Sequence, residues 1–210
     1  MLLTGKTSPI QISKRILDLT LTIPGLLILS PLLLVVSLLV GVKFGTPIIF
    51  RQKRPGYLGK PFWIYKFRSM TNVYDAQENL LPDNQRLTRL GRLLRSTSFD
   101  ELPELFNVLR GEMSIVGPRP LLMQYLDRYS PEQARRHEVL PGITGWAQVN
   151  GRNALTWAEK FKLDVWYVDH WSFWLDIRIL LLSIVKVLRR EGINQPGQAT
   201  AEEFLGDHDS

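Results

Sequence analysis

An uncharged apolar segment, LTLTIPGLLILSPLLLVVSLLVGV at residues 19–42, constrains this chain more than any other feature. Because each helical residue adds about 1.5 Å, a straight helix of this length would reach about 36 Å, longer than the ~30 Å hydrocarbon core of a bilayer. The segment is too long for a removable signal peptide and lacks the small-residue cleavage pattern, so we expect it to stay attached. The chain therefore belongs at a membrane.

Two prolines, Pro24 and Pro31, lie inside this segment. Each removes an intrahelical hydrogen bond, and we expect a kink at Ser30 and Pro31, where the serine hydroxyl could satisfy a freed carbonyl. Lysine and arginine flank both ends of the segment, so their distribution gives little guidance on orientation. The residues leave two topologies open: a kinked helix that spans the membrane, and a helix that enters, bends and leaves by the same face.

The charge balance favours an anionic partner. The 210 residues carry 26 basic and 20 acidic side chains, a net charge of +6, which suits nucleic acid, lipid headgroups or a phosphorylated substrate. Nucleic acid is disfavoured because the chain has a long apolar anchor and no recognisable nucleic-acid-binding motif. The absence of cysteine excludes disulfides and thiolate metal sites. The length predicts one domain, or two at most.

Three further segments have readable patterns. Residues 47–53 and 62–68 read as strands joined by a glycine- and proline-containing turn, which predicts a basic β-hairpin. Residues 85–95 have the spacing of a basic amphipathic helix, which we expect in the headgroup region, although a solvated face over a core is the alternative. An apolar helix close to the C-terminus follows five aromatic residues, and membrane-interface and core packing explain these equally well: Trp166, Tyr167, Trp171, Phe173 and Trp174.

Two adjacent acids, Asp100 and Glu101, precede Pro103. Proline is tolerated in the first turn of a helix, so we expect a helix to begin near residues 100–102 with both acids at its positive end. A capping box between Ser98 and Glu101 would explain the pair without any catalytic role. The same position also favours phosphate binding and an ionised Asp100.

Arginines near the acids point to phosphate chemistry. Arg119 lies between two prolines that restrict its backbone, and Arg152 ends the glycine-containing stretch PGITGWAQVNGRN at residues 141–153. Carboxylates that can bind a divalent metal, together with arginines that can grip a diphosphate, suit phosphoryl transfer with a carboxylate nucleophile. Adjacent acids fit a glycosidase poorly, and the sequence has neither a P-loop nor a Rossmann fingerprint.

These residues resemble one family closely, the monotopic bacterial phosphoglycosyl transferases, and in particular its small members. The resemblance covers nearly the whole chain apart from the two ends. It rests on these stretches: KRILD, SP at residues 30–31, FRQKRPG, KFRSM, DELPELFNVLRGEMSIVGPRPLL and RHEVLPGITGWAQVNGRN.

The resemblance implies transfer of a phospho-sugar from a UDP-sugar to undecaprenyl phosphate or another polyprenol phosphate, with release of UMP. Asp100 matches the nucleophile that forms a covalent phosphosugar-aspartate, and Glu101 completes the pair with Mg²⁺. We expect four side chains to bind substrate phosphates: Lys66, Arg95, Arg119 and Arg152. No residue can be named that selects the sugar.

The expected fold is α+β and mostly helical, with a short β-hairpin and interfacial helices around a compact catalytic domain. The resemblance favours a re-entrant membrane helix broken at Ser30 and Pro31. Residues 1–45 would form this membrane segment, residues 46–192 the catalytic domain, and residues 193–210 a tail. The expected location is the cytoplasmic face of the bacterial inner membrane, in contact with phospholipid. A homo-oligomer is compatible with the sequence. The main rival is a non-catalytic membrane-surface adaptor.

Overall fold

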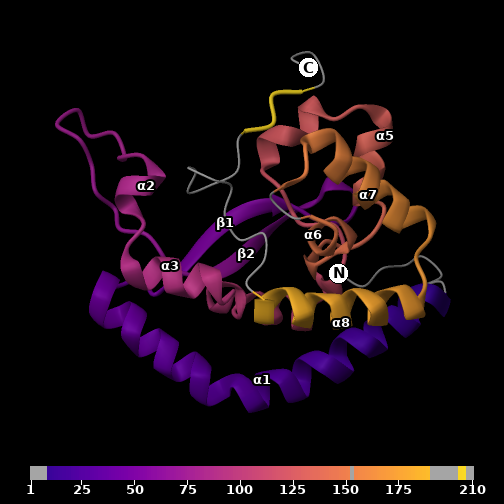
Figure 1. Cartoon of the computed structure of the whole chain (residues 1–210), viewed down its shortest axis with the longest axis horizontal. Coiled ribbons are helices and arrows are strands. Elements are labelled where there is room, and N and C mark those ends of the chain that lie inside the picture. The colour runs from indigo at the N-terminus through magenta and orange to yellow at the C-terminus, as the bar shows by residue number, and fades with distance from the viewer. Residues whose placement is uncertain (1–8, 152–153, 190–202, 207–210) are drawn as a thin grey trace.

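The computed structural model describes residues 9–151, 154–189 and 203–206 and confirms a mostly helical α+β fold with one β-hairpin (Figure 1). The long helix α1 lies along one side of the molecule, and the remaining elements pack above it. The α-helices are α1 (Pro9–Phe44), α2 (Asp83–Arg86), α3 (Arg89–Ser96), α4 (Glu104–Arg110), α5 (Pro131–Ala134), α6 (Trp146–Val149), α7 (Trp157–Asp169) and α8 (Phe173–Arg189). The strands are β1 (Ile49–Pro55), β2 (Pro61–Phe67), β3 (Ser114–Val116) and β4 (Gly142–Thr144). The 3₁₀ turns are η1 (Tyr57–Gly59), η2 (Phe99–Glu101), η3 (Met123–Arg128) and η4 (Arg135–His137).

Helix α1 is continuous over 36 residues and contains both prolines. It curves so that both of its ends rise toward the other elements (Figure 1). The hydroxyl of Ser30 donates a 2.8 Å hydrogen bond to the carbonyl of Leu27. Helix α1 therefore stays helical through Ser30 and Pro31 and curves along its length.

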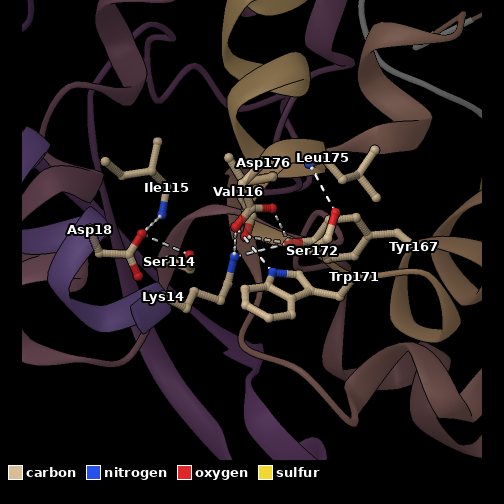
Figure 2. Close-up of polar contacts among 10 residues, drawn as sticks. All are labelled: Lys14, Asp18, Ser114, Ile115, Val116, Tyr167, Trp171, Ser172, Leu175 and Asp176. Carbon is tan, nitrogen blue, oxygen red and sulfur yellow. Dashed lines mark hydrogen bonds and ion pairs between the residues drawn. The ribbon is translucent and has the colours of Figure 1, made fainter. Parts of the chain in front are cut away.

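The first part of α1 is attached to the rest of the protein by polar contacts (Figure 2). The ammonium of Lys14 lies 2.6 Å from the buried carboxylate of Asp176 on α8. Asp18 accepts hydrogen bonds of 2.9 Å from the Ser114 hydroxyl and from the Ile115 backbone N–H of β3. These contacts join the start of the apolar helix to two elements that are far away in sequence.

The last part of α1 packs through apolar side chains. Val36 and Val40 form a buried cluster with Phe67 of β2 and Leu94 of α3. Between the two attached parts, apolar side chains of α1 face outward, and Leu27 and Ile28 are 72% and 76% exposed. Within the described part of the chain, α1 is the one helix long and apolar enough to cross a membrane.

The predicted β-hairpin is confirmed with a shift of one or two residues. Strands β1 and β2 pair antiparallel, from Ile49 opposite Phe67 to Pro55 opposite Pro61. The inner face of β2 contributes Phe62 and Ile64 to a core with Val108 of α4 and Met113, which precedes β3. The hairpin therefore packs directly on the helix that follows the acid pair.

The expected single helix over residues 85–95 is wrong, because Leu87 and Thr88 separate α2 from α3. The hydroxyl of Thr88 accepts a 3.1 Å hydrogen bond from the Gly91 N–H and caps α3, which competes with continuation of the helix. The C-terminal helix is observed as α8. Its Trp174 is 76% exposed, and Leu181 and Ile184 also point outward.

Candidate active site

The acid pair lies on the 3₁₀ turn η2, directly before α4. The sequence predicts an α-helix that begins near residues 100–102, but α4 begins later, at Glu104. Ser98 has a left-handed backbone with φ 57°, and its side chain makes no capping hydrogen bond, so the predicted capping box with Glu101 is wrong. Simple capping does not explain why Asp100 and Glu101 are adjacent.

Glu101 is held by two cations from different parts of the fold. Its Oε1 atom lies 2.8 Å from Nζ of Lys66 on β2 and also accepts a hydrogen bond from Nη2 of Arg119, in the loop after β3. Burial alone would raise the pKa of Glu101, but Arg119 and Lys66 outweigh it and hold that pKa well below its usual range. Glu101 is therefore a fixed anion, and two of the four predicted phosphate-binding side chains meet on it.

Glu104, in the first turn of α4, belongs to the same cluster. It is 1% exposed, and its Oε1 lies 3.0 Å from Nζ of Lys66. Burial raises the pKa of Glu104 to about 7; Lys66 opposes the rise and Glu101 adds to it. From the sequence this residue could be read only as a first-turn acid, because its burial beside Lys66 depends on how the hairpin packs.

Asp100 is 8% exposed. Burial is the main reason why its pKa is raised, and the charge of Glu101 adds to this effect. Three cations act in the opposite direction and favour the ionised carboxylate: Lys66, Arg95 and Arg119. Arg95 comes from α3, where its Nε donates a 3.1 Å hydrogen bond to the hydroxyl of Ser69.

A cavity opens beside these groups. It is lined by Arg54, Ile64, Lys66, Glu104, Arg119, Pro120 and Leu121. Arg54 comes from the inner face of β1 and donates a 2.7 Å hydrogen bond to the side chain of Gln52, while its buried Nε has no hydrogen-bond partner among the described residues. Burial, and then the charge of Arg119, lower the pKa of Arg54 to about 10. Arg54 is not among the four predicted phosphate-binding side chains, although it lies in the FRQKRPG stretch.

The backbone carbonyl of Arg119 is held by a hydrogen bond from Arg136. Arg136 donates a 2.8 Å hydrogen bond to the Arg119 carbonyl and forms a buried ion pair of 2.7 Å with Asp164 on α7. Fixing the backbone leaves the Arg119 guanidinium fewer ways to move away from Glu101.

Glycines near β4 serve protein packing. A Cβ atom on Gly142 would lie 2.1 Å from the backbone N of Gly117, and one on Gly145 would lie 2.2 Å from its carbonyl oxygen. Gly142 and Gly145 therefore let β4 and the residue that follows it approach the loop before Arg119. Arg152, the fourth predicted phosphate ligand, lies outside the described residues.

The acid pair has the right chemistry for a hard cation. Mg²⁺ prefers oxygen ligands and commonly uses one or two carboxylates, completed by water and substrate phosphate. Asp100 and Glu101 supply such carboxylates, and both contacts of Glu101 described above use only its Oε1 atom. Within the described residues, no cluster of three or more His, Cys, Asp or Glu side chains could hold a metal by itself. The pair therefore fits Mg²⁺ only as a partial site.

Comparison with known proteins gives a consistent result. Residues 10–190 match the family described as bacterial sugar transferase. The chain is 58% identical to a Bacillus subtilis protein named "Uncharacterized sugar transferase EpsL", over 95% of this chain and 98% of that protein. It is 43% identical to the UDP-glucose:undecaprenyl-phosphate glucose-1-phosphate transferase of Xanthomonas campestris, over 84% of this chain and 39% of that protein. It is also 40% identical to the undecaprenyl-phosphate galactose phosphotransferase of Salmonella typhimurium, over 85% of this chain and 41% of that protein. The chain thus spans nearly all of the first relative and about two fifths of the other two.

Proposed function

Because the chain belongs to the bacterial sugar transferase family, we propose that it transfers a sugar phosphate from a UDP-sugar to undecaprenyl phosphate and releases UMP. One observation carries the proposal. The buried Asp100 lies next to Glu101, whose charge is balanced by Lys66 and Arg119, beside a cavity that contains a further arginine. A site with cations around a carboxylate suits a reaction in which an anion must attack a phosphate.

In the first step, a carboxylate oxygen of Asp100 attacks the β-phosphorus of the UDP-sugar. The bond from that phosphorus to the oxygen shared with the α-phosphate breaks, and UMP leaves with the electron pair. The sugar phosphate is then bound covalently to Asp100. In the second step, a phosphate oxygen of undecaprenyl phosphate attacks the same phosphorus and releases the Asp100 carboxylate, so the enzyme is regenerated.

The cations around the pair make this attack possible. Two anions repel each other, and burial of Asp100 strengthens this repulsion because little water screens it. Lys66 and Arg119 neutralise Glu101, so its charge adds less to the field at the phosphorus. Arg95 favours the ionised form of Asp100, and Arg54 lines the cavity where a phosphate would lie.

Mg²⁺ is part of the proposal. Asp100 and Glu101 would hold it, and the bound ion would supply positive charge at the diphosphate. The side chains themselves would orient the reacting groups and exclude water from them.

Placement at a membrane completes the proposal. Both ends of α1 contact the same catalytic part, through Lys14 and Asp18 at one end and through Val36 and Val40 at the other. Since the exposed apolar middle of α1 lies between these contacts, the arrangement favours a re-entrant helix over a spanning one. Exposed apolar side chains on α8, such as Trp174, suit a helix in the headgroup region. We place the catalytic part at the cytoplasmic face of the inner membrane, where UDP-sugars are available.

The test is UMP release by purified, detergent-solubilised protein with Mg²⁺, undecaprenyl phosphate and a panel of UDP-sugars. Wild-type protein should release UMP with at least one sugar, and Asp100→Asn should not. When undecaprenyl phosphate is omitted, mass spectrometry should find a sugar phosphate on the peptide that contains Asp100. Full activity of Asp100→Asn would contradict the covalent mechanism, and no release across the panel would favour the adaptor.

A further inference from the structure

The segment Glu203–Gly206 lies against the elements that follow Arg119. Phe204 is 3% exposed and forms a buried cluster with Tyr125 of η3 and Phe161 of α7. Its ring meets that of Phe161 edge-on at a centroid distance of 4.9 Å and stacks on that of Tyr129 at 5.9 Å. A single aromatic side chain near the C-terminus therefore fills the centre of an aromatic cluster.

Polar contacts hold the same segment in place. The backbone N–H of Phe204 donates a 3.1 Å hydrogen bond to the Tyr125 hydroxyl. Arg128 donates to the carbonyl of Phe204 and lies 2.8 Å from the carboxylate of Glu203. Gln124 donates a 2.5 Å hydrogen bond to the same carboxylate. The segment has specific partners on η3, so its position is set by more than apolar contact.

The cluster connects to the acid pair through a short series of contacts. Tyr129, which stacks on Phe204, accepts a 3.3 Å hydrogen bond from Arg136. Arg136 donates to the carbonyl of Arg119, and the guanidinium of Arg119 donates to Glu101. Leu121, which lines the cavity, packs against the same aromatic cluster, as does Leu122.

We infer that the segment Glu203–Gly206 is a positioning strap, in which Phe204 holds the loop of Arg119 and the cavity wall at Leu121 in place for the reaction. This inference rests on the proposed function. Phe204 touches neither substrate nor reacting atoms in this scheme and acts through Tyr129 and Arg136.

The test compares full-length wild type with Phe204→Ala and with Leu205→Ala. Leu205 is the neighbouring residue of the same segment and is 62% exposed, so it is a matched control. In the UMP-release assay, kcat/KM of Phe204→Ala should fall by about 10- to 100-fold, since small displacements of positioning groups have effects of this size. Leu205→Ala should behave as wild type. A synthetic peptide of residues 201–210 should restore activity to Phe204→Ala, and the same peptide with alanine in place of Phe204 should not.

Amide hydrogen exchange provides a readout without catalysis. Phe204→Ala should speed exchange in the segments around residues 119–129 and 136–137, whereas a general loss of stability would speed it throughout the chain. Wild-type kinetics in Phe204→Ala, or faster exchange spread over all elements with no rescue by the peptide, would overturn the inference. If wild type releases no UMP but the local exchange change is present, the proposed function fails and the strap still holds this loop.

Discussion

The hydroxyl of Ser30 donates to the carbonyl of Leu27, the carbonyl that residue 31 would bind in a regular helix if it were not a proline. Ser30→Ala should therefore leave this carbonyl unpaired in the exposed apolar middle of α1. We expect it to reduce the free energy of unfolding in micelles by about 0.5–2 kcal/mol. In a Pro31→Ala background, the backbone N–H of residue 31 can donate to the Leu27 carbonyl. The effect of Ser30→Ala on the free energy of unfolding should then nearly vanish.

Ser37→Ala is the matched control for this pair. Ser37 donates a 2.7 Å hydrogen bond to the carbonyl of Leu33, which its own backbone N–H is also placed to reach. Loss of the Ser37 hydroxyl should therefore reduce the free energy of unfolding by less than loss of the Ser30 hydroxyl does. Equal effects of Ser30→Ala in both backgrounds would show that the hydroxyl does not replace the missing donor.

A second prediction concerns the attachment of α1 to α8. Asp176 is fully buried and is paired with Lys14, and it also accepts hydrogen bonds from the Tyr167 hydroxyl at 2.7 Å and from Trp171 at 3.1 Å. Lys14→Ala leaves the buried carboxylate without its cation, so we expect a loss of about 3–5 kcal/mol in the free energy of unfolding. Lys43→Ala is the control: Lys43 is exposed at the other end of the same helix, so its loss should change the free energy of unfolding little.

The double variant Lys14→Met/Asp176→Asn separates charge from packing. It removes both charges and keeps a polar group for Tyr167 and Trp171, so it should be more stable than Lys14→Ala in the same unfolding measurement. A double variant as unstable as the single one would mean that the ion pair is not the source of the effect.

Some features that depend on near neighbours could be predicted from the sequence, although the interruption at Thr88 and the left-handed backbone of Ser98 could not. Pairings between residues far apart in the sequence could not be predicted. The bond of Ser30 follows from a proline one residue away, and the hairpin follows from local strand and turn patterns. By contrast, Lys14 and Asp176 are 162 positions apart, and nothing in the sequence pairs them. The roles of Glu104 and Arg54 likewise appear only when β1 and β2 pack on α4, because burial decides both their pKa values and their partners.

A third prediction concerns the pH dependence of stability through Glu104. Its pKa is raised in the folded protein to about 7 by burial, so the folded state keeps a proton that the unfolded chain releases. The stabilisation from this proton is complete below about pH 4.5 and is lost as the pH rises through about 7. Relative to Glu104→Gln, wild type should therefore become less stable over this interval, and the difference should level off above it. Unfolding midpoints measured without Mg²⁺ check this, and a difference that does not change with pH would show that Lys66 keeps Glu104 ionised.

The last prediction concerns Arg54. Its guanidinium lines the cavity beside Lys66 and Arg119, but those two cations are paired with Glu101 and the buried Nε of Arg54 has no hydrogen-bond partner among the described residues. A buried donor without a partner is costly, and a substrate phosphate would satisfy it with a charge-assisted hydrogen bond. Arg54→Ala should therefore raise KM for the UDP-sugar by about 10- to 100-fold, which corresponds to about 1.5–3 kcal/mol.

Lys53→Ala is the control for Arg54, because Lys53 is the preceding residue on β1 and its exposed ammonium lies 5.4 Å from the ring centroid of Trp63, on the other face of the hairpin. It removes the same charge from the same strand and should leave KM unchanged. Arg54→Lys should recover part of the affinity for the UDP-sugar, since lysine restores the charge but cannot form the bidentate hydrogen bonds of arginine. If Arg54→Ala and Lys53→Ala raise KM equally, the arginine acts only through the overall charge of the hairpin and does not bind the phosphate.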